Sequence, residues 1–140
     1  MATGPRRARG TAGDVPVVSE KRLLQIVVAL AGLVPLTAGA LGMLSPAMLG
    51  LYGDRVAVSH AAYLSGLLFG IGLAYWWLIP DIEKRAGAFT LLTAIVQVGG
   101  LARLYTALRL GLWPLGTVLP LLMELVVTPL LWIWQQRISK

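Results

Sequence analysis

Four long apolar segments constrain this chain more than any other feature of its sequence. They cover approximately residues 23–44, 59–79, 86–108 and 113–133 of a 140-residue chain. Each holds about the 20 residues that a helix needs to cross roughly 30 Å of hydrocarbon. Because a helix satisfies its own backbone hydrogen bonds in lipid, each segment is predicted to be a transmembrane helix. The strands of a membrane barrel would need about 10 residues of strict alternation, which none of the four segments shows.

The composition excludes a soluble globular domain and a disordered chain. Hydrophobic residues make up 57% of the sequence and charged residues only 13%, whereas a soluble domain is about 25% charged. A chain this short cannot bury so much apolar surface, because small domains have the poorest ratio of interior to surface. The chain has no cysteine, which excludes disulfides, thiolate metal sites and cysteine nucleophiles.

Short connections predict the topology of the four spans. A charged turn at 81–85 joins the second and third spans, and a turn at 111–114 joins the third and fourth. Spans joined this closely are antiparallel neighbours, so we expect an all-α, up-down-up-down four-helix bundle over residues 20–137. After the first span, Ser45-Pro46 is typical of an N-cap followed by proline at the first helical position. We therefore expect a short interfacial helix at 46–52.

The basic residues predict the orientation. Residues 1–19 contain three arginines and no apolar period, which is typical of a disordered basic tail. Cytoplasmic loops carry an excess of lysine and arginine, and here nine basic residues share the side of the two termini against three on the other side. Both termini are therefore expected in the cytoplasm, with the spans in the cell membrane. The nine are Arg6, Arg7, Arg9, Lys21, Arg22, Lys84, Arg85, Arg137 and Lys140, and the three are Arg55, Arg103 and Arg109.

Each span has one face of small and polar residues, which helix contacts in lipid use for close approach and hydrogen bonding. In the fourth span this face holds Thr117, Glu124, Thr128 and Gln135. Gly66 and Gly70 form a GxxxG pattern, which serves either a contact within the chain or a dimerisation face. The glycines predicted to pack against neighbouring helices are Gly32, Gly39, Gly66, Gly70 and Gly100.

Two charged residues inside the spans are predicted to pair. A carboxylate such as Glu124 costs on the order of 3 kcal/mol in mid-membrane. At 1.5 Å per residue, Glu124 lies about 15 Å and Arg103 about 9 Å below the turn at 111–114, an offset that an arginine side chain can cover. The pair either fixes the register of the two spans or forms a binding or proton site. The neighbours expected around it are His60, Tyr63, Tyr105 and Gln97.

No catalytic or cofactor motif is present in the sequence. A single histidine excludes a bis-histidine haem or a zinc site built within one chain. Gly70-Ile-Gly72 lacks the third glycine and the preceding strand of a nucleotide-binding turn, and no acid and base flank a serine as in a triad. We therefore expect no metal, no cofactor, no nucleic-acid partner and, on balance, no enzymatic activity.

Three stretches of the third and fourth spans form a recognisable pattern: Gly100-Leu-Ala-Arg103-Leu-Tyr105, Gly111-Leu-Trp-Pro114 and Leu122-Met-Glu124-Leu-Val-Val-Thr-Pro129. In these stretches the chain resembles a known family of small bacterial membrane proteins, catalogued as domain of unknown function 4345. The resemblance covers roughly residues 22–136 and implies a four-helix membrane fold in which the arginine and the glutamate recur, here as Arg103 and Glu124. It implies no activity. A more distant similarity to the DoxX-like four-span proteins implies a link to respiratory or redox assemblies.

Two functions follow from these features. The absence of catalytic motifs favours a non-catalytic membrane subunit or structural protein that contacts the lipid bilayer and a membrane-protein partner or a second copy. The alternative is a proton-coupled small-molecule transporter or binder that uses Glu124 and Arg103. The small multidrug transporters, which are similar in size, keep their essential acid in the first span, and residues 23–44 contain no acid.

Overall fold

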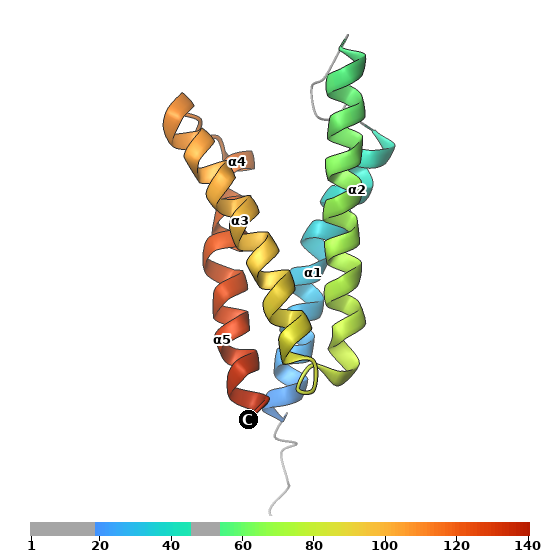
Figure 1. The fold of residues 1–140 in the computed structure, drawn as a ribbon, viewed down its shortest axis with the longest axis vertical. Helices are drawn as coiled ribbons and strands as arrows, with labels where there is room; N and C mark the ends of the chain where they lie inside the picture. Colours follow the sequence, from blue (N-terminus) through green and yellow to red (C-terminus); the bar gives the residue numbers. More distant parts are fainter. Residues whose placement is uncertain (1–18, 46–53) are drawn as a thin grey trace, which may run out of the picture.

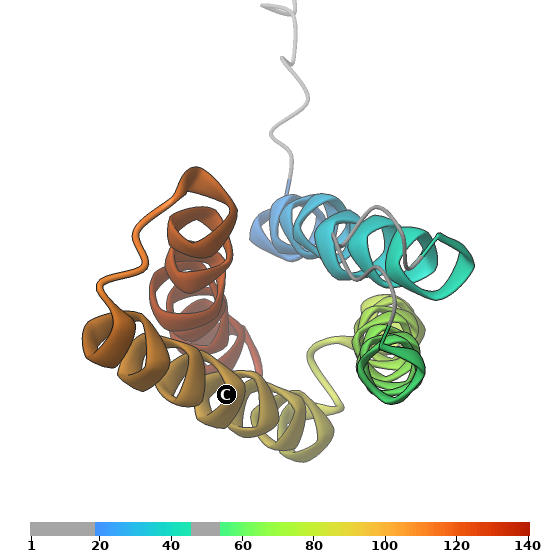
Figure 2. The ribbon, with the colours of Figure 1, turned by 90° about the horizontal axis from the view of Figure 1, so that it is seen from above.

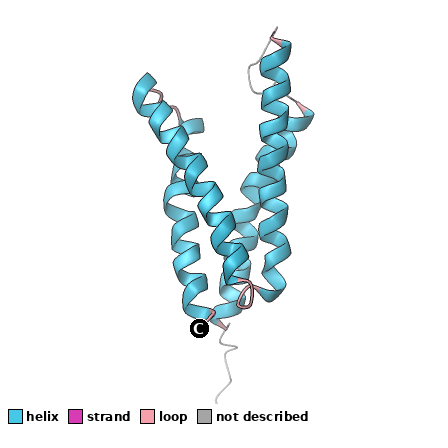
Figure 3. Cartoon of the chain, in the orientation of Figure 1, coloured by secondary structure: helices cyan, strands magenta, loops and turns pink. Residues whose placement is uncertain are grey.

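The computed structural model describes residues 19–45 and 54–140, and every regular element in those ranges is a helix (Figures 1 and 3). Helix α1 spans Glu20–Leu44, α2 spans Arg55–Leu78 and α3 spans Ala86–Leu110. A short 3-10 turn, η2, follows α2 at Ile79–Asp81. The fourth rod consists of α4 (Leu115–Leu122), a π-helical turn η3 (Met123–Val127) and α5 (Thr128–Ile138). The predicted interfacial helix and, apart from Ser19, the predicted basic tail lie outside the described residues.

The four predicted transmembrane helices are confirmed as helices of sufficient length and hydrophobicity. The stretches 20–44, 55–81, 86–110 and 115–138 are each 24 to 27 residues long and apolar enough to cross a membrane. Large apolar side chains cover their outward surfaces, and Leu44 and Leu115 remain 81% and 70% exposed. Hydrocarbon is the solvent that suits such a surface. The chain is therefore a multi-pass membrane protein in contact with lipid.

Capping residues explain where the helices begin and end. The Asp54 carboxylate accepts hydrogen bonds from the amides of Val56 (2.9 Å) and Ala57 (3.2 Å), so α2 begins at Arg55, four residues before the predicted start at 59. Gly111 adopts a φ of +63°, a left-handed conformation that glycine adopts without strain, and it ends α3. The fourth rod continues to Ile138, beyond the predicted end at 133.

Consecutive helices run in opposite directions, as the short turns predict, and they form two hairpins. One hairpin is α1 with α2, and the other is α3 with the α4–η3–α5 rod (Figures 1 and 2). Both views show the hairpins meeting at the end where α1 begins and α5 ends, and diverging toward the opposite end. We call these the joined end and the open end. The fold is thus a splayed pair of hairpins rather than a bundle packed along its whole length.

Glycines set the close contact within the first hairpin. A Cβ atom added to Gly39 would lie 2.6 Å from the Phe69 backbone nitrogen, and one added to Gly72 would lie 2.8 Å from Leu36 Cγ. Gly32 is similarly crowded, by the Trp76 ring. Among the described residues, the nearest atom at Gly66 would be Met43 Sδ at 3.3 Å, and at Gly70 no atom lies within 4 Å. Gly39 and Gly72, rather than the GxxxG pair, therefore carry the close approach of α1 and α2.

The hydrophobic core lies at the joined end, around the turn between the hairpins. Long polar side chains bind the carbonyls of this turn, with Gln25 Nε2 donating to Ile79 O and Gln135 Nε2 to Ile82 O, both at 2.7 Å. The Tyr75 hydroxyl lies 3.3 Å from Thr93 Oγ1 and links α2 to α3. These contacts hold the hairpins together at one end. The buried cluster itself consists of Leu24, Val28, Tyr75, Leu78, Ile82, Phe89 and Leu131.

Candidate functional site: an intramembrane ion pair and its pocket

The structure brings Arg103 of α3 and Glu124 of η3 together in the half of the second hairpin nearer the open end. Arg103 Nε donates to Glu124 Oε2 and Nη2 donates to Oε1, each at 3.1 Å. Two parallel hydrogen bonds of this kind are the strong form of an arginine–carboxylate pair. The Glu124 side chain is 16% exposed and the Arg103 side chain 42%. Both oxygens of the carboxylate are thus occupied by the same guanidinium.

Glu124 lies on the π-helical turn η3, and the backbone hydrogen bonds around this residue explain why the turn is stable. In the π register the amide of Thr128 bonds to Met123 O, and the Thr128 hydroxyl also donates to that carbonyl, at 2.7 Å. The next amide in this register would bond to Glu124 O, but residue 129 is a proline and has no N–H. Gln97 Nε2 from α3 donates to Glu124 O instead. The turn therefore depends on a side chain of the neighbouring helix.

Gly100 allows α3 to approach this turn. A Cβ atom added to Gly100 would lie 2.9 Å from Glu124 Cβ and 2.8 Å from Leu125 Cδ2, closer than any ordinary contact. Residues three and four apart lie on one helix face, so Gln97, Gly100 and Arg103 all face the fourth rod. Along α3, Gln97 thus binds the carbonyl of Glu124, Gly100 leaves room for its backbone, and Arg103 binds its carboxylate.

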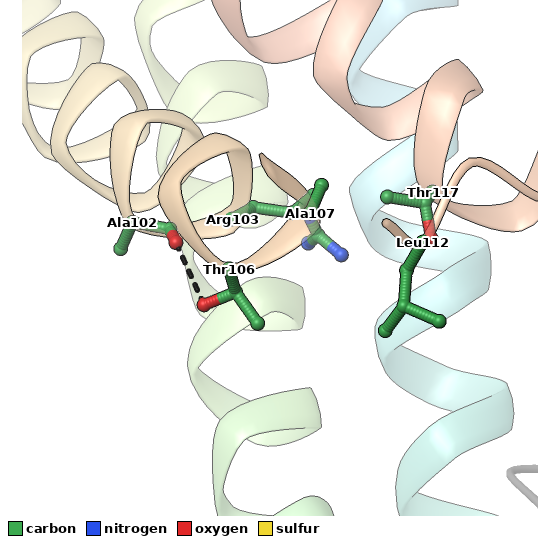
Figure 4. A pocket seen from close by; sticks show the side chains of 6 residues that line it. All are labelled: Ala102, Arg103, Thr106, Ala107, Leu112 and Thr117. Atoms are coloured by element: carbon green, nitrogen blue, oxygen red, sulfur yellow. Dashed lines mark hydrogen bonds between the residues drawn. The ribbon is translucent and has the colours of Figure 1, made fainter. Parts of the chain in front are cut away.

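A pocket of about 410 Å³ lies beside the pair, between the last turns of α3 and the start of α4. Figure 4 shows the Arg103 guanidinium between α3 and the segment that carries Leu112 and Thr117. The Thr106 hydroxyl on this wall donates to Ala102 O of its own helix at 3.1 Å. The pocket thus combines one cationic group and two hydroxyls with apolar walls. The lining residues are Ala102, Arg103, Thr106, Ala107, Leu112 and Thr117.

The sequence matches the family described as Domain of unknown function (DUF4345) over residues 23–135. The match runs from the beginning of α1 almost to the end of α5 and includes both members of the ion pair. The chain belongs to this family. Comparison with curated proteins and with solved structures finds no match. Membership in DUF4345 carries no activity, so the chemistry of the site has to come from its geometry.

Of the neighbours expected around the ion pair, Gln97 donates a hydrogen bond to Glu124, and none of the other three hydrogen-bonds to Arg103 or Glu124. His60 is exposed on α2, and its Nδ1 lies 3.1 Å from Val56 O of its own helix. Tyr63, also on α2, is 65% exposed. Tyr105 is on α3, but its hydroxyl accepts a hydrogen bond from Arg109 Nη1 at 3.0 Å. The divergence of the hairpins separates α2, which carries His60 and Tyr63, from the pair at this end (Figure 1).

Sequence reasoning missed the pocket and the π-helical turn. Thr106 and Leu112 line the pocket, yet neither carries a signal that separates it from an ordinary lipid-facing residue. The π turn has a recognisable signal, because Pro120 and Pro129 flank Glu124 and remove two backbone donors from one helix. Across residues 19–45 and 54–140, no three histidine, aspartate or glutamate side chains lie close enough together to hold a metal ion.

A second ionic contact lies at the joined end, outside the spans. Lys21 Nζ bonds to Glu83 Oε1 at 2.7 Å and connects the start of α1 to the turn between the hairpins. This hydrogen bond, with the positive charge of Lys21, lowers the pKa of the Glu83 carboxyl below its usual value. The other oxygen, Oε2, is buried without a hydrogen-bond partner in the described part of the chain. The contact ties the hairpins together near the membrane surface.

Proposed function

We propose that this protein is a non-catalytic component of the membrane that associates with a transmembrane partner, either another membrane protein or a second copy. The observation that carries the proposal is the divergence of the two hairpins: the buried cluster that they share in the described chain lies at the joined end (Figure 1). Toward the open end each hairpin presents apolar helix faces that the other does not cover. Helices in lipid associate through close packing of such faces, particularly where glycine allows backbones to approach.

Glycines are available for such packing on both hairpins. Gly70, in the half of α2 nearer the joined end, and Gly99, near the middle of α3, have no atom of the described residues within 4 Å of the position of an added Cβ. Gly70 and Gly66 form the GxxxG pattern, and neither approaches a helix backbone of the described chain closely. This favours a contact of the pattern with another chain. A partner helix lying against α2 there would bury surface that this chain leaves open.

The state of Glu124 favours this function over proton-coupled transport. A carboxylate that takes up and releases protons during transport must exchange its partners, whereas both Glu124 oxygens are bound to Arg103. The pair therefore acts as a clamp that sets the register of α3 and the fourth rod.

The proposed location is the cell membrane, with both termini in the cytoplasm, as the distribution of basic residues indicates. The chain has no native cysteine, so single cysteines report their side without background. Cysteines at Lys140, beyond α5, and at Leu115, the first residue of α4, should react with a membrane-impermeant maleimide from opposite sides. Labelling of both from one side would contradict the topology.

Photo-crosslinking tests the association directly. A photoreactive amino acid at Gly70 should give discrete protein adducts in native membranes, because this position faces the proposed partner. The matched control is Leu91, which is 63% exposed on α3 near the joined end and should give lipid adducts only. Lipid adducts at both positions, together with a monomer in mild detergent, would refute the proposal. A monomer that binds a small molecule in a pH-dependent way would favour the transport alternative.

A further inference from the structure

We propose that the pocket between α3 and α4 binds the phosphodiester group of a membrane phospholipid, through the edge of the Arg103 guanidinium that Glu124 leaves free. The inference goes beyond the association proposed above and does not depend on it. It rests on the hydrogen-bonding capacity of Arg103, on the shape and lining of the pocket, and on the level of the pocket along the helices.

The guanidinium of Arg103 has N–H donors that its bonds to Glu124 do not use. An arginine side chain carries five N–H groups, and the bonds to Glu124 use one on Nε and one on Nη2. The second hydrogen of Nη2 and one hydrogen of Nη1 form another edge, with the fork geometry that suits two oxygens of a phosphate. In the described part of the chain no further acceptor bonds to this edge. A polar group within a bilayer requires a partner, so the free edge calls for an oxygen-rich ligand.

The pocket beside this edge can hold such a ligand. Its volume of about 410 Å³ far exceeds the roughly 30 Å³ occupied by one water. Thr117 brings a hydroxyl from α4 to the wall opposite Arg103 (Figure 4). The Thr106 hydroxyl has already given its hydrogen to Ala102 O, so Thr117 is the second donor. Ala107 and Leu112 supply an apolar wall on which the glycerol and the first acyl carbons can lie.

The level of the pocket selects a lipid rather than a soluble anion. Arg103 lies about 10 Å from the end of α3 at Leu110, at 1.5 Å per residue. The residues around that end are typical of a membrane interface, with Trp113 50% exposed and Arg109 stacked over the Tyr105 ring at 5.8 Å. The pocket therefore reaches from the headgroup level, where phospholipid phosphates lie, into the hydrocarbon.

The charge balance predicts which lipids bind. Arg103 and Glu124 neutralise each other, so the site attracts phosphate oxygens through directed hydrogen bonds and not through net positive charge. Phosphatidylethanolamine and phosphatidylglycerol should therefore bind with similar affinity. Diacylglycerol with the same acyl chains has no phosphate and should bind at least tenfold more weakly.

Native mass spectrometry of the delipidated protein, titrated with these three lipids, tests the inference. Thr117→Val keeps the shape of the pocket and the ion pair, and should weaken phospholipid binding about fivefold through loss of one hydrogen bond. Arg103→Lys keeps a cation opposite Glu124 but lacks the second edge, and should weaken binding about tenfold. Thr37→Val is the matched control, because the Thr37 hydroxyl donates to Leu33 O within α1, at 2.8 Å. It should bind lipid as the parent does.

Three results would overturn the inference. The first is equal binding of diacylglycerol and phosphatidylethanolamine, which would mean that the phosphate is not recognised. The second is parental affinity in Thr117→Val when the melting temperature shows that the variant is folded. The third is displacement of bound phospholipid by millimolar inorganic phosphate, which would identify the pocket as a site for soluble anions. None of these results bears on whether the hairpins associate with a partner helix, so the two proposals fail separately.

Discussion

Replacing the members of the ion pair one at a time should have unequal effects, because the two side chains differ in exposure. Arg103→Met leaves the Glu124 carboxylate, which is 16% exposed, without its partner inside the membrane. Insertion scales assign about 2.5–3.5 kcal/mol to a charged side chain at the helix centre. Allowing for the residual exposure, we expect Arg103→Met to lower the free energy of unfolding by about 2–3 kcal/mol.

Glu124→Leu leaves the guanidinium, which is 42% exposed and can extend along α3 to the headgroups. Long cationic side chains commonly reach the interface in this way, so the expected loss is only about 1 kcal/mol. The double variant contains no unpaired charge at this site, so its free energy of unfolding should lie within about 1 kcal/mol of that of the parent. The coupling energy is then about 2–4 kcal/mol, above the roughly 0.6 kcal/mol average for polar contacts between membrane helices.

The measurement is equilibrium unfolding of the parent, both single variants and the double variant in mixed micelles, monitored by circular dichroism. The four free energies form a double-mutant cycle. Losses that add to within about 0.5 kcal/mol would show that the two side chains are not coupled. A larger loss in Glu124→Leu than in Arg103→Met would refute the assignment of Glu124 as the more deeply placed partner.

Three further predictions concern other contacts. The lowered pKa of Glu83 means that its bond to Lys21 contributes stability above pH 4.5, the usual value, and loses it as the pH falls through the lower folded pKa. Lys21→Met should therefore flatten the decline of the melting temperature as the pH falls below 4.5, and an unchanged profile would exclude the contact. Gly39→Ala should cost about 1–3 kcal/mol, because its Cβ would lie 2.6 Å from the α2 backbone. Gly70→Ala, with open space at its Cβ, should be neutral or stabilising in the same unfolding assay. Gln97→Leu should cost about 1–3 kcal/mol by leaving a carbonyl of the π turn unpaired, and a parental melting temperature would show that the turn is self-sufficient.

The sequence by itself determined the four helices and the antiparallel course of the chain. Each rests on a local requirement: a backbone in lipid must bond to itself within one segment, and a turn as short as 81–85 can only join neighbours. The depth of a residue in the membrane also follows from its position in its own helix, because the rise per residue is constant. Counting residues therefore sufficed to place Arg103 and Glu124 at levels that a side chain can bridge, and the structure joins them by two hydrogen bonds.

Only the tertiary structure decided how the helices lie side by side. His60 and Tyr63 have suitable depths, yet they lie on a hairpin that diverges from the ion pair (Figure 2). Helices in lipid have no hydrophobic driving force for association, so their side-by-side packing depends on which faces fit closely. Within the described chain, Gly39 lies against the backbone of α2, whereas Gly70 lies against no neighbouring helix. The π turn is decided in the same way. A proline frees the carbonyl of Glu124, but the donor that satisfies it comes from Gln97, 27 residues earlier in the chain.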